Sequence, residues 1–589
     1  MCGILGWQFP LGLGQGAEVL AGMSALIAHR GPDDSGHFFD EANGIALGHR
    51  RLSIIDLSAA SHQPMNDTIS GVTLIYNGEL YNFRELRTDL EALGHTFRSA
   101  GDTEVVLRGY LEWGSASFAR FAGMFALAIW DQRTQVLHLA RDATGMKPLY
   151  YLPCGDGIAF ASELKAFQAL PGFTAAIDPV AVQQYLEFGY VFEEDQTMLQ
   201  GVRKVAPGHR LEISNGQIRI NAAWFTPPSP DARDTRQEQD RVEELGELLQ
   251  KVVGEHLIAD VPLAVMLSGG LDSSVVASLA SKQSPLLTIT MGFSGAGFDE
   301  RDNARRVSQF IGSRHVEVLI TPEEVKREVV QGVRVFDDLF ADWGTVTTRI
   351  LYRRCRQQGI KVVLVGEGAD ELFGGYGISN VPHRLGLWQK FRLYQKYAGR
   401  RYGTQFGRFR SVLDEYLEAS QGDGFDAVRL FETRRQLPNQ YVMKVDKASM
   451  AESVEARAPY LDRRVAELAY RTPRQWLLRG GENKYLLRAM SRQRQLLPDA
   501  VSAQPKFGAP LAADWMDDDT SFRRFAAEQL LDSSSQTQRL GLGNAMKAYF
   551  EDNRAGYAFP AGISIFRNLA WRLLLLELWA QHYLAPHRP

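Results

Sequence analysis

The sequence predicts two folds in one chain, an α+β domain at the amino-terminal end and an α/β domain after it. Up to about residue 200, short β-type runs with turn residues between them outnumber the helical patterns, which is typical of an α+β domain. From about residue 237, apolar strand-like runs alternate with helical patterns, which indicates a parallel sheet covered on both faces. After about residue 380 the patterns are mostly helical.

Hydrophobic spacing predicts the individual elements. The first domain is expected to contain helices at 18–27 and 82–93. Its strands are expected at 44–49, 72–76, 125–130, 136–140 and 158–161. The second is expected to begin with a helix at 237–256. It then continues with strands at 261–267, 286–293, 315–320 and 361–365. Between the two, 226–234 is rich in proline and polar residues, which predicts a linker. We therefore expect domains at 2–215 and 235–589.

Composition and charge exclude several classes of protein. The chain of 589 residues exceeds what one hydrophobic core usually holds, so more than one domain is expected. A net charge of −4 without a clustered basic excess argues against nucleic-acid partners. The most apolar stretch, 569–584, is interrupted by charges at helical spacing, which predicts a core-packed helix rather than a membrane span. No signal peptide is expected at the start.

The three cysteines (Cys2, Cys154 and Cys355) are too few and too scattered for a disulfide framework, which predicts a reducing, cytoplasmic location. Cys2 is the candidate nucleophile. Removal of Met1 would leave Cys2 with its thiol and a free α-amine on one residue, so the amine can take the thiol proton. By position alone, Cys2 is equally well a cysteine that happens to lie near the start.

A turn rich in glycine and serine follows the expected strand at 261–267. It runs Ser268-Gly-Gly-Leu-Asp-Ser-Ser274 into a helical pattern, so its N–H groups and hydroxyls form an anion site at a helix start. Gly269 and Gly270 allow close approach of the backbone. The Gly-Lys-Ser/Thr ending of a Walker A loop is absent. Because Asp272 would repel phosphate, we expect Mg²⁺ carried by a polyphosphate here.

A second acidic cluster, Gly366-Glu-Gly-Ala-Asp-Glu371, follows the expected strand at 361–365. In open α/β sheets, ligands bind beyond the carboxyl ends of the strands, so Asp370 is expected to share the metal with Asp272. Taken alone, the cluster is also typical of a solvated loop whose carboxylates cap a helix.

Four ordered motifs identify a family resemblance that covers nearly the whole chain. The loop at 268–274 resembles the pyrophosphate-binding loop of ATP pyrophosphatases. Together with 366–376, 453–462 and 484–488, it resembles glutamine-dependent asparagine synthetase of the B type. The resemblance implies that ATP is cleaved between its α and β phosphates while a carboxylate becomes an acyl-adenylate.

The resemblance also implies roles in the second domain. Asp272 and Asp370 would hold Mg²⁺, and Lys484 would balance charge at the α-phosphate. Glu367 would order the acceptor and ammonia around the adenylate. Without the resemblance, Lys484 is equally a surface helical lysine. The implied ATP-binding residues are Leu267, Ser268, Gly269, Gly270, Asp272, Ser273, Met291, Val365 and Gly366.

The same family has an amino-terminal class II glutamine amidotransferase domain, an N-terminal-nucleophile hydrolase built as a four-layer sandwich. Its motifs are matched at 2–4, 29–33, 51–54, 76–82, 101–104 and 141–151. The resemblance implies catalysis by Cys2, with an oxyanion hole from Asn77 and the Gly78 N–H. Taken singly, Asn77-Gly78 is more typical of a hairpin turn, and 29–33 and 141–151 of structural segments. The implied glutamine-binding residues are Arg51, Leu52, Ser53, Ile54, Ile55, Asn77, Gly78, Glu79 and Asp102.

The chemistry of glutamine agrees with this set. Free glutamine has an α-carboxylate, onto which Arg51 can fork, and an α-ammonium, which by analogy with the family Glu79 and Asp102 would match. The two domains then imply one cycle, in which Cys2 releases ammonia that reaches the acyl-adenylate through an enclosed passage. The resemblance implies L-aspartate as the acceptor and L-asparagine as the product, and the family suggests a homodimer.

One region departs from the family's pattern. Within 337–348, Leu339 stands where the family tends to have proline, Trp343 is bulky, and the proline before a threonine is missing. The stretch 506–511 also departs from the usual form. If these segments line the acceptor pocket, another carboxylate is amidated, such as a uronic acid of a surface polysaccharide precursor.

Two further hypotheses are a non-catalytic scaffold and a β-lactam-forming synthetase. A scaffold predicts the loss of catalytic residues, and all of those implied are present: Cys2, Asp272, Glu367, Asp370 and Lys484. Relatives that form β-lactams often lose the working cysteine, so an intact Cys2 with Arg51, Asn77 and Asp102 argues against that reaction.

Overall fold

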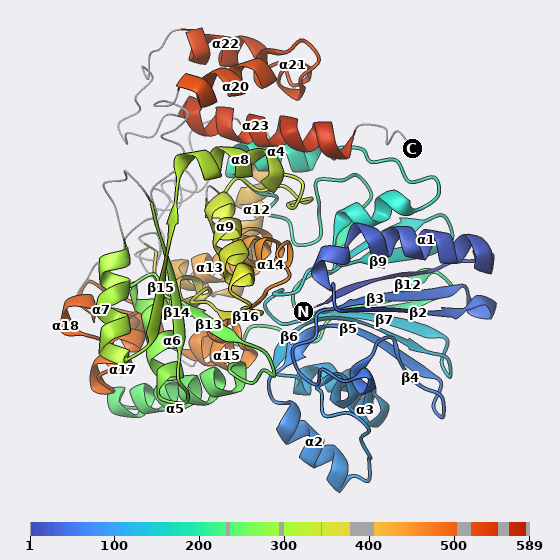
Figure 1. Cartoon of the computed structure of the whole chain (residues 1–589), viewed down its shortest axis with the longest axis horizontal. Helices are drawn as coiled ribbons and strands as arrows, with labels where there is room; N and C mark the ends of the chain where they lie inside the picture. The colour runs from blue at the N-terminus through green and yellow to red at the C-terminus, as the bar shows by residue number, and fades with distance from the viewer. Residues whose placement is uncertain are drawn as a thin grey trace.

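The computed structural model describes residues 2–230, 236–293, 300–342, 344–376, 406–502, 520–551 and 565–584. Two halves lie side by side, with the start of the chain at their junction (Figure 1). Residues 226–230 of the expected linker have no regular structure. No helix within these ranges combines the length and apolar character that a membrane span needs.

Two antiparallel sheets form the amino-terminal half. The first, in spatial order, contains β10 (Arg203–Lys204), β8 (Tyr150–Cys154), β9 (Gly157–Ala161), β1 (Gly3–Gln8), β3 (Ile45–Arg51) and β2 (Asp34–Asp40). The second contains β12 (Gln217–Ala223), β11 (His209–Ser214), β7 (Val136–Arg141), β6 (Gly123–Asp131), β5 (Val72–Leu80) and β4 (Met65–Asp67). Because β12 pairs with β11, this sheet continues beyond residue 215, where the sequence placed the end of the first domain.

Helices cover the outer faces of the two sheets. They are α1 (Leu13–Leu26), α2 (Phe83–Ala92) and α3 (Thr103–Trp113), and α4 (Pro179–Phe188) lies nearby. α1 packs on β1 and β3, α3 packs on β5, and β1 and β3 contact β5 between the sheets. Buried side chains such as Ile4, Leu47 and Ile75 fill the space between the sheets. The order helix, sheet, sheet, helix, visible in Figure 1, confirms the predicted four-layer sandwich.

A parallel sheet forms the centre of the carboxy-terminal half. Its strands, in spatial order, are β15 (Arg314–Ile320), β14 (Leu287–Phe293), β13 (Leu263–Met266), β16 (Val362–Leu364) and β17 (Glu455–Arg457). The chain adds β14 and β15 on one side of β13 and then β16 and β17 on the other. The order of addition therefore reverses beside β13 and β16, which is where α/β sheets bind ligands at the carboxyl ends of strands. The predicted α/β fold is confirmed.

Helices surround this sheet and, as predicted, dominate the later residues that the structure describes. Those around the sheet are α5 (Glu238–His256), α6 (Leu271–Ser281), α7 (Arg301–Ile311), α8 (Pro322–Gly332), α9 (Gly344–Gln357) and α10 (Ala369–Phe373). Those after residue 405 are α12 (Phe406–Ala419), α13 (Gly424–Phe431), a π-helical segment (Glu432–Tyr441), α14 (Val442–Met450), α15 (Arg463–Arg471), α16 (Arg474–Leu477), α17 (Tyr485–Gln493), α18 (Asp499–Ser502), α20 (Thr520–Leu531), α21 (Gln536–Arg539), α22 (Gly543–Glu551) and α23 (Ile565–Tyr583). A small hairpin joins β18 (Leu478–Arg479) to β19 (Glu482–Asn483). The predicted apolar helix at 569–584 is α23, which buries Trp571, Leu574 and Trp579.

Buried ion pairs join the two halves. Arg30 Nη1 lies 2.9 Å from Asp446 Oδ2, and both side chains are almost completely buried. Arg457 Nη2 lies 2.9 Å from Glu79 Oε2 in a second buried pair. Charges removed from water are tolerated only when they are paired closely, so these contacts fix how the halves meet.

Candidate functional site

Cys2 lies directly before β1, at the junction of the halves. Its main-chain N–H donates to Asn77 Oδ1 (2.9 Å), and its carbonyl oxygen accepts from Arg30 Nε (3.0 Å). Only 7% of the residue is exposed. Burial raises the pKa of the thiol, against the lowering effects of the chain's amino terminus, the Leu52 N–H and Arg51. A neighbouring base must therefore take the proton before the sulfur attacks.

Asn77 and Gly78 lie in the middle of β5, paired with β6 along its whole length. They are therefore not a hairpin turn. The Asn77 side chain is buried, and its Nδ2 has no hydrogen-bond acceptor among the residues described. Leaving a buried donor unpaired costs about 1–3 kcal/mol, which favours an anionic oxygen at this position. A Cβ at Gly78 would lie 2.4 Å from the Met124 carbonyl oxygen, so only glycine fits against β6.

Arg51, at the end of β3, is held by the loop that follows it. Its Nη1 donates to the Ser58 carbonyl (3.0 Å) and its Nη2 to the Asp56 carbonyl (2.5 Å). Each of these nitrogens has a second N–H, so the fixed guanidinium can still fork onto a carboxylate. In the same loop, Leu52 and Ile54 are buried while Ser53 and Ile55 are half-buried.

Glu79 and Asp102 are both nearly buried, and Asp102 Oδ2 accepts from the Leu80 N–H at 2.9 Å. Burial raises the pKa of Asp102. Burial also raises the pKa of Glu79, and the charge of Asp102 raises it further although Arg457 opposes this. A bound cation would relieve the repulsion between the two carboxylates, and an ammonium group is such a cation.

The predicted anion loop follows β13, and α6 begins inside it. Gly269 has φ +77°, and a Cβ there would lie 2.6 Å from the Ala304 nitrogen, so glycine is required. The hydroxyls of Ser268 and Ser273 lie 2.9 Å apart, and the Gly270 N–H donates to Ser268 Oγ at 3.2 Å. These contacts curl the loop around the start of the helix, as an anion site requires.

The second loop, after β16, comes against the first. A Cβ at Gly366 would lie 2.8 Å from the Ser273 nitrogen, so glycine lets the two loops touch. Leu267 and Val365, at the ends of β13 and β16, are buried, and Met291 in β14 is half-buried. The structure thus brings the residues expected to bind ATP to one edge of the sheet.

Glu367 lies in the second loop near several charges. Burial raises the pKa of its carboxyl group, Lys444 lowers it, and Asp370 raises it again. Lys444 is itself paired with Asp342, with Nζ and Oδ2 3.0 Å apart. Lys444, Glu367 and Asp342, one basic and two acidic side chains, therefore border the edge of the expected ATP site.

Lys484 links the two loops. Its Nζ lies 2.6 Å from Asp272 Oδ2 and 2.6 Å from Asp370 Oδ1. The residue is only 5% exposed and has φ +56° directly before α17, a conformation that costs energy outside glycine. Burial lowers the pKa of Lys484, but the two carboxylates outweigh burial and raise it. Lys484 is therefore not a surface helical lysine, and Gly368, not Asp370, is the N-cap of α10.

Asp272 and Asp370 fit Mg²⁺ carried by a polyphosphate. Both contribute oxygen donors aimed at one point, where the ammonium of Lys484 stands in for a cation. Mg²⁺ in nucleotide sites is commonly held by one or two carboxylates plus phosphate oxygens and waters. The described residues contain no group of three or more His, Cys, Asp or Glu suited to holding a metal by themselves.

The region that departs from the family's pattern is only partly described, since Trp343 and 506–511 lie outside the described residues. Leu339 is 2% exposed and belongs to the hydrophobic core. The preceding Asp337 and Asp338 accept main-chain N–H groups of Lys165 (3.0 Å) and Met198 (2.9 Å) in the other half. Leu339 thus packs at the junction of the halves.

Sequence reasoning gave no role to Glu455, Arg457 or Tyr460, although they lie in the motif at 453–462. In the structure, Arg457 contacts Glu79 and Tyr460 contacts Asp272. The available signal was a pair of charges, Glu455 and Arg457, flanking a single alanine in a short strand with apolar neighbours.

Comparisons with known proteins agree with this geometry. A profile described as the glutamine amidotransferase domain matches residues 1–225, and one described as asparagine synthase matches residues 244–581. The chain is 32% identical to glutamine-hydrolysing asparagine synthetase 1 of Bacillus subtilis, over 87% of each chain. The chain belongs to the asparagine synthase family.

A second relative is also named as an asparagine synthetase, whereas a third is named as an amidase. The chain is 32% identical to a putative glutamine-hydrolysing asparagine synthetase of Mycobacterium tuberculosis, over 98% of this chain and 97% of that one. It is 35% identical to amidase chry2 of Gibberella zeae, over 60% of this chain and 54% of that one. As an asparagine synthase family member with an amidotransferase domain, the chain is an ATP-dependent, glutamine-hydrolysing amidotransferase, a ligase.

Proposed function

We propose that this enzyme is a glutamine-dependent asparagine synthetase, which converts L-aspartate, L-glutamine and ATP to L-asparagine, L-glutamate, AMP and pyrophosphate. The observation that supports this most directly is the pair of sites in one molecule. Cys2 with Asn77 forms the first site, and Asp272 with Asp370 and Lys484 forms the second. Each site has the groups that one half of the reaction needs.

Glutamine hydrolysis is assigned to the first site. The Cys2 thiol, deprotonated by the α-amine that removal of Met1 exposes, attacks the side-chain amide carbon. Asn77 Nδ2 and the Gly78 N–H stabilise the resulting oxyanion. Ammonia leaves with the proton, and water then cleaves the thioester to give glutamate and the free thiol. Arg51 binds the substrate carboxylate, while Glu79 and Asp102 bind the ammonium.

Adenylation is assigned to the second site. Asp272 and Asp370 would hold Mg²⁺, which neutralises phosphate charge when it is bound. The loop at 268–274 receives the pyrophosphate through its N–H groups and hydroxyls. Lys484, with its pKa raised, remains an ammonium that stabilises negative charge as a carboxylate attacks the α-phosphate. Glu367 orders the acceptor and the incoming ammonia.

Aspartate as the acceptor is the finer part of this proposal. Lys444, beside Glu367 and Asp342, is a cation suited to the second carboxylate of a dicarboxylic amino acid. The alternative acceptor, a uronic acid of a surface polysaccharide precursor, rests on the sequence departures at Trp343 and at 506–511. The core position of Leu339 does not support it. Mg²⁺ as the ion, a cytoplasmic location and a homodimer remain parts of the proposal.

Pyrophosphate release tests the proposal. The purified enzyme is given ATP, Mg²⁺ and glutamine with L-aspartate or, separately, with a panel of uronic acids, and pyrophosphate, AMP and the amide product are measured. We expect equal amounts of AMP, pyrophosphate and asparagine with aspartate. Release with a uronic acid alone would establish the alternative acceptor, and conversion of ATP only to ADP would refute both.

A further inference from the structure

The two charged groups at one end of glutamine are assigned to residues on separate loops. Arg51, which binds the α-carboxylate in the proposed function, is followed by residues 52–61, which we call the Arg51 loop. Asp102, which binds the α-ammonium, ends residues 98–102, which we call the Asp102 loop. Both groups of an α-amino acid are attached to one carbon atom, so the two loops must lie at a fixed spacing to bind them together.

The carboxylate of Asp56 joins the two loops. Its Oδ2 accepts from the main-chain N–H of Ala100 in the Asp102 loop (2.8 Å) and from the Ser61 hydroxyl in the Arg51 loop (2.9 Å). Its Oδ1 accepts from the main-chain N–H (3.1 Å) and the hydroxyl (2.5 Å) of Ser58. One side chain therefore makes four hydrogen bonds that fix the Asp102 loop against the Arg51 loop.

The Asp102 loop packs closely on this carboxylate and is itself held in shape. A Cβ at Gly101 would lie 2.8 Å from Ser61 Oγ and 3.4 Å from Asp56 Cβ, so the glycine lets the loops approach each other. Within the Asp102 loop, the main-chain N–H of Ser99 donates to Glu104 Oε2 at 2.7 Å. Because the loop is held on both sides, a displacement of Asp56 displaces the Asp102 loop as well.

The main chain of Asp56 is fixed as well as its side chain. Its φ is +52°, in the left-handed region that aspartate and asparagine tolerate better than most residues. Its carbonyl oxygen accepts from Arg51 Nη2 (2.5 Å), and its N–H donates to Asp260 Oδ2 (2.9 Å). Burial raises the pKa of Asp56, but the four hydrogen bonds to its carboxylate outweigh burial and lower it to about 2. Asp56 thus contacts Arg51 through its main chain and the Asp102 loop through a charged side chain.

We propose that Asp56 is a positioning residue for glutamine, which sets the spacing between the Arg51 guanidinium and the Asp102 carboxylate. This inference rests on the proposed function. Asp56 acts through its neighbours, and holding both binding groups in place before the substrate arrives reduces the cost of ordering them. The enzyme thereby favours ligands in which a carboxylate and an ammonium share one carbon, the class of free α-amino acids, over amides that lack these groups.

Two variants of the full-length enzyme test this role. Each carboxylate oxygen of Asp56 accepts one main-chain N–H, and an amide nitrogen cannot accept, so Asp56→Asn must lose one of these bonds in either orientation. We expect it to raise the glutamine KM at least about tenfold and to leave kcat within about twofold. Asp56→Gly keeps the positive φ, removes all four bonds and is expected to raise KM further. Ammonia-dependent amide formation should stay at the parent rate in both variants.

Two reagents that alkylate the Cys2 thiol separate substrate binding from thiol reactivity. The diazoketone analogue of L-glutamine has the α-carboxylate and the α-ammonium of glutamine, whereas iodoacetamide has neither. Labelling is followed by mass spectrometry of the peptide that contains Cys2. At reagent concentrations below saturation, we expect Asp56→Asn to react about tenfold more slowly with the diazoketone. Its reaction with iodoacetamide should keep the parent rate.

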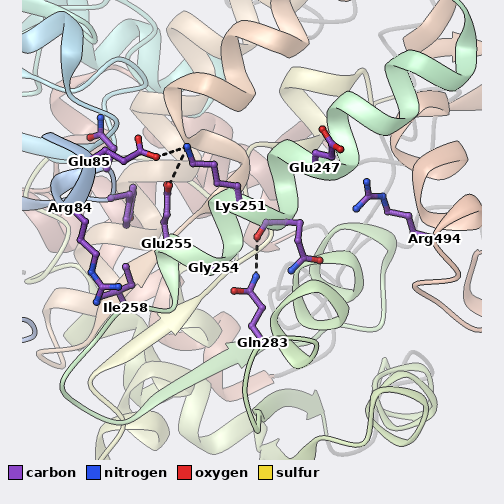
Figure 2. Close-up of a pocket in the computed structure, with 12 residues that line it drawn as sticks. Arg84, Glu85, Glu247, Lys251, Gly254, Glu255, Ile258, Gln283 and Arg494 are labelled. Atoms are coloured by element: carbon purple, nitrogen blue, oxygen red, sulfur yellow. Dashed lines mark hydrogen bonds and ion pairs between the residues drawn. The ribbon is translucent and has the colours of Figure 1, made fainter. Parts of the chain in front are cut away.

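A matched control changes another carboxylate of the same half to an amide. In the groove of about 660 Å³ between α2 and α5, Glu85 Oε1 lies 2.7 Å from Lys251 Nζ (Figure 2). Both side chains are about half exposed, so Glu85→Gln removes an ion pair that solvent screens. Like Asp56, Glu85 contacts a residue of the other half, but it contacts neither of the two loops. Glu85→Gln is expected to keep the parent KM for glutamine.

The outcomes distinguish this inference from the proposed function. An unchanged glutamine KM in Asp56→Asn refutes the positioning role, whether or not kcat falls. Equal slowing of both reagents also refutes it, because the thiol itself is then disturbed, and so does an equal rise of KM in Glu85→Gln. A parent enzyme that hydrolyses no glutamine, or a Cys2→Ala enzyme that hydrolyses it at the parent rate, refutes the proposed function instead.

Discussion

The ammonium nitrogen of Lys484 lies 2.6 Å from Asp272 Oδ2, and the same nitrogen lies 2.6 Å from Asp370 Oδ1. In the structure, this lysine thus neutralises the two carboxylates that are expected to hold a metal. A free cation must displace this lysine before it can bind both carboxylates. Lysine and cation therefore compete for one position.

Lys484→Met should raise the affinity for free Mg²⁺. Without the ammonium, the two carboxylates repel each other, and a divalent cation relieves that repulsion. We expect Mg²⁺ to raise the Tm of the variant more than that of the parent, although adenylation is lost. Calorimetric scans with and without Mg²⁺ measure this, with Lys282→Met as a surface control. An equal Tm response in parent and variant would contradict the competition.

Cys2→Ala should abolish glutamine-dependent amide formation and leave ammonia-dependent formation intact. The substitution removes the nucleophile, whereas the second site lies in the other half of the molecule. Product formation with glutamine and with ammonium chloride is compared side by side. Cys154→Ala, which removes a half-buried thiol of β8, is the control and should behave as the parent. Full glutamine-driven turnover in Cys2→Ala would overturn the assignment of the first site.

Asn77→Ala should lower kcat for glutamine hydrolysis by about 10²–10³, the usual loss for one oxyanion donor. The buried Nδ2 acts on the oxyanion that develops in the transition state, so the glutamine KM should change little. Steady-state glutaminase kinetics measure both constants. The exposed Asn66 of β4 supplies the control variant Asn66→Ala. A rise in KM with unchanged kcat would instead assign Asn77 to substrate binding.

His256→Phe should make the stability of the enzyme less sensitive to acid. Burial lowers the pKa of His256 to about 3, and its ring stacks on Tyr81 across the junction. In the unfolded chain the imidazole binds a proton near pH 6.5, so stability is lost as the pH falls from 6.5 towards 3. Between pH 7 and pH 5 this one group accounts for about 2 kcal/mol.

Thermal unfolding at pH 7 and pH 5 tests this sign. The Tm of the parent should fall more than that of His256→Phe, because phenylalanine keeps a ring against Tyr81 but cannot be protonated. The exposed His37 provides the control His37→Gln, which should follow the parent. A steeper pH dependence in His256→Phe would contradict the prediction.

Much of the fold was predictable because local patterns agree with it. The strands around 72–76 and 263–266 are short apolar runs, and the helix at 238–256 has clear amphipathic spacing. The three-residue strand β17 was missed because Glu455 and Arg457 have no apolar period. Its charges are buried only because Glu79 and Arg457 meet across the junction, which no local pattern encodes.

The sequence by itself determined the parts of each site. Gly269 and Gly366 allow close approach of the backbone, and the serines and carboxylates at the strand ends are the groups that phosphate and its cation need. It also determined the family, through motifs in a fixed order. Only the tertiary structure decided that Asn77 lies within a strand facing Cys2, that Lys484 is buried between two carboxylates, and that one segment contacts both sites. These facts depend on contacts between residues far apart in the chain, and burial, which sets their charge states, exists only after folding.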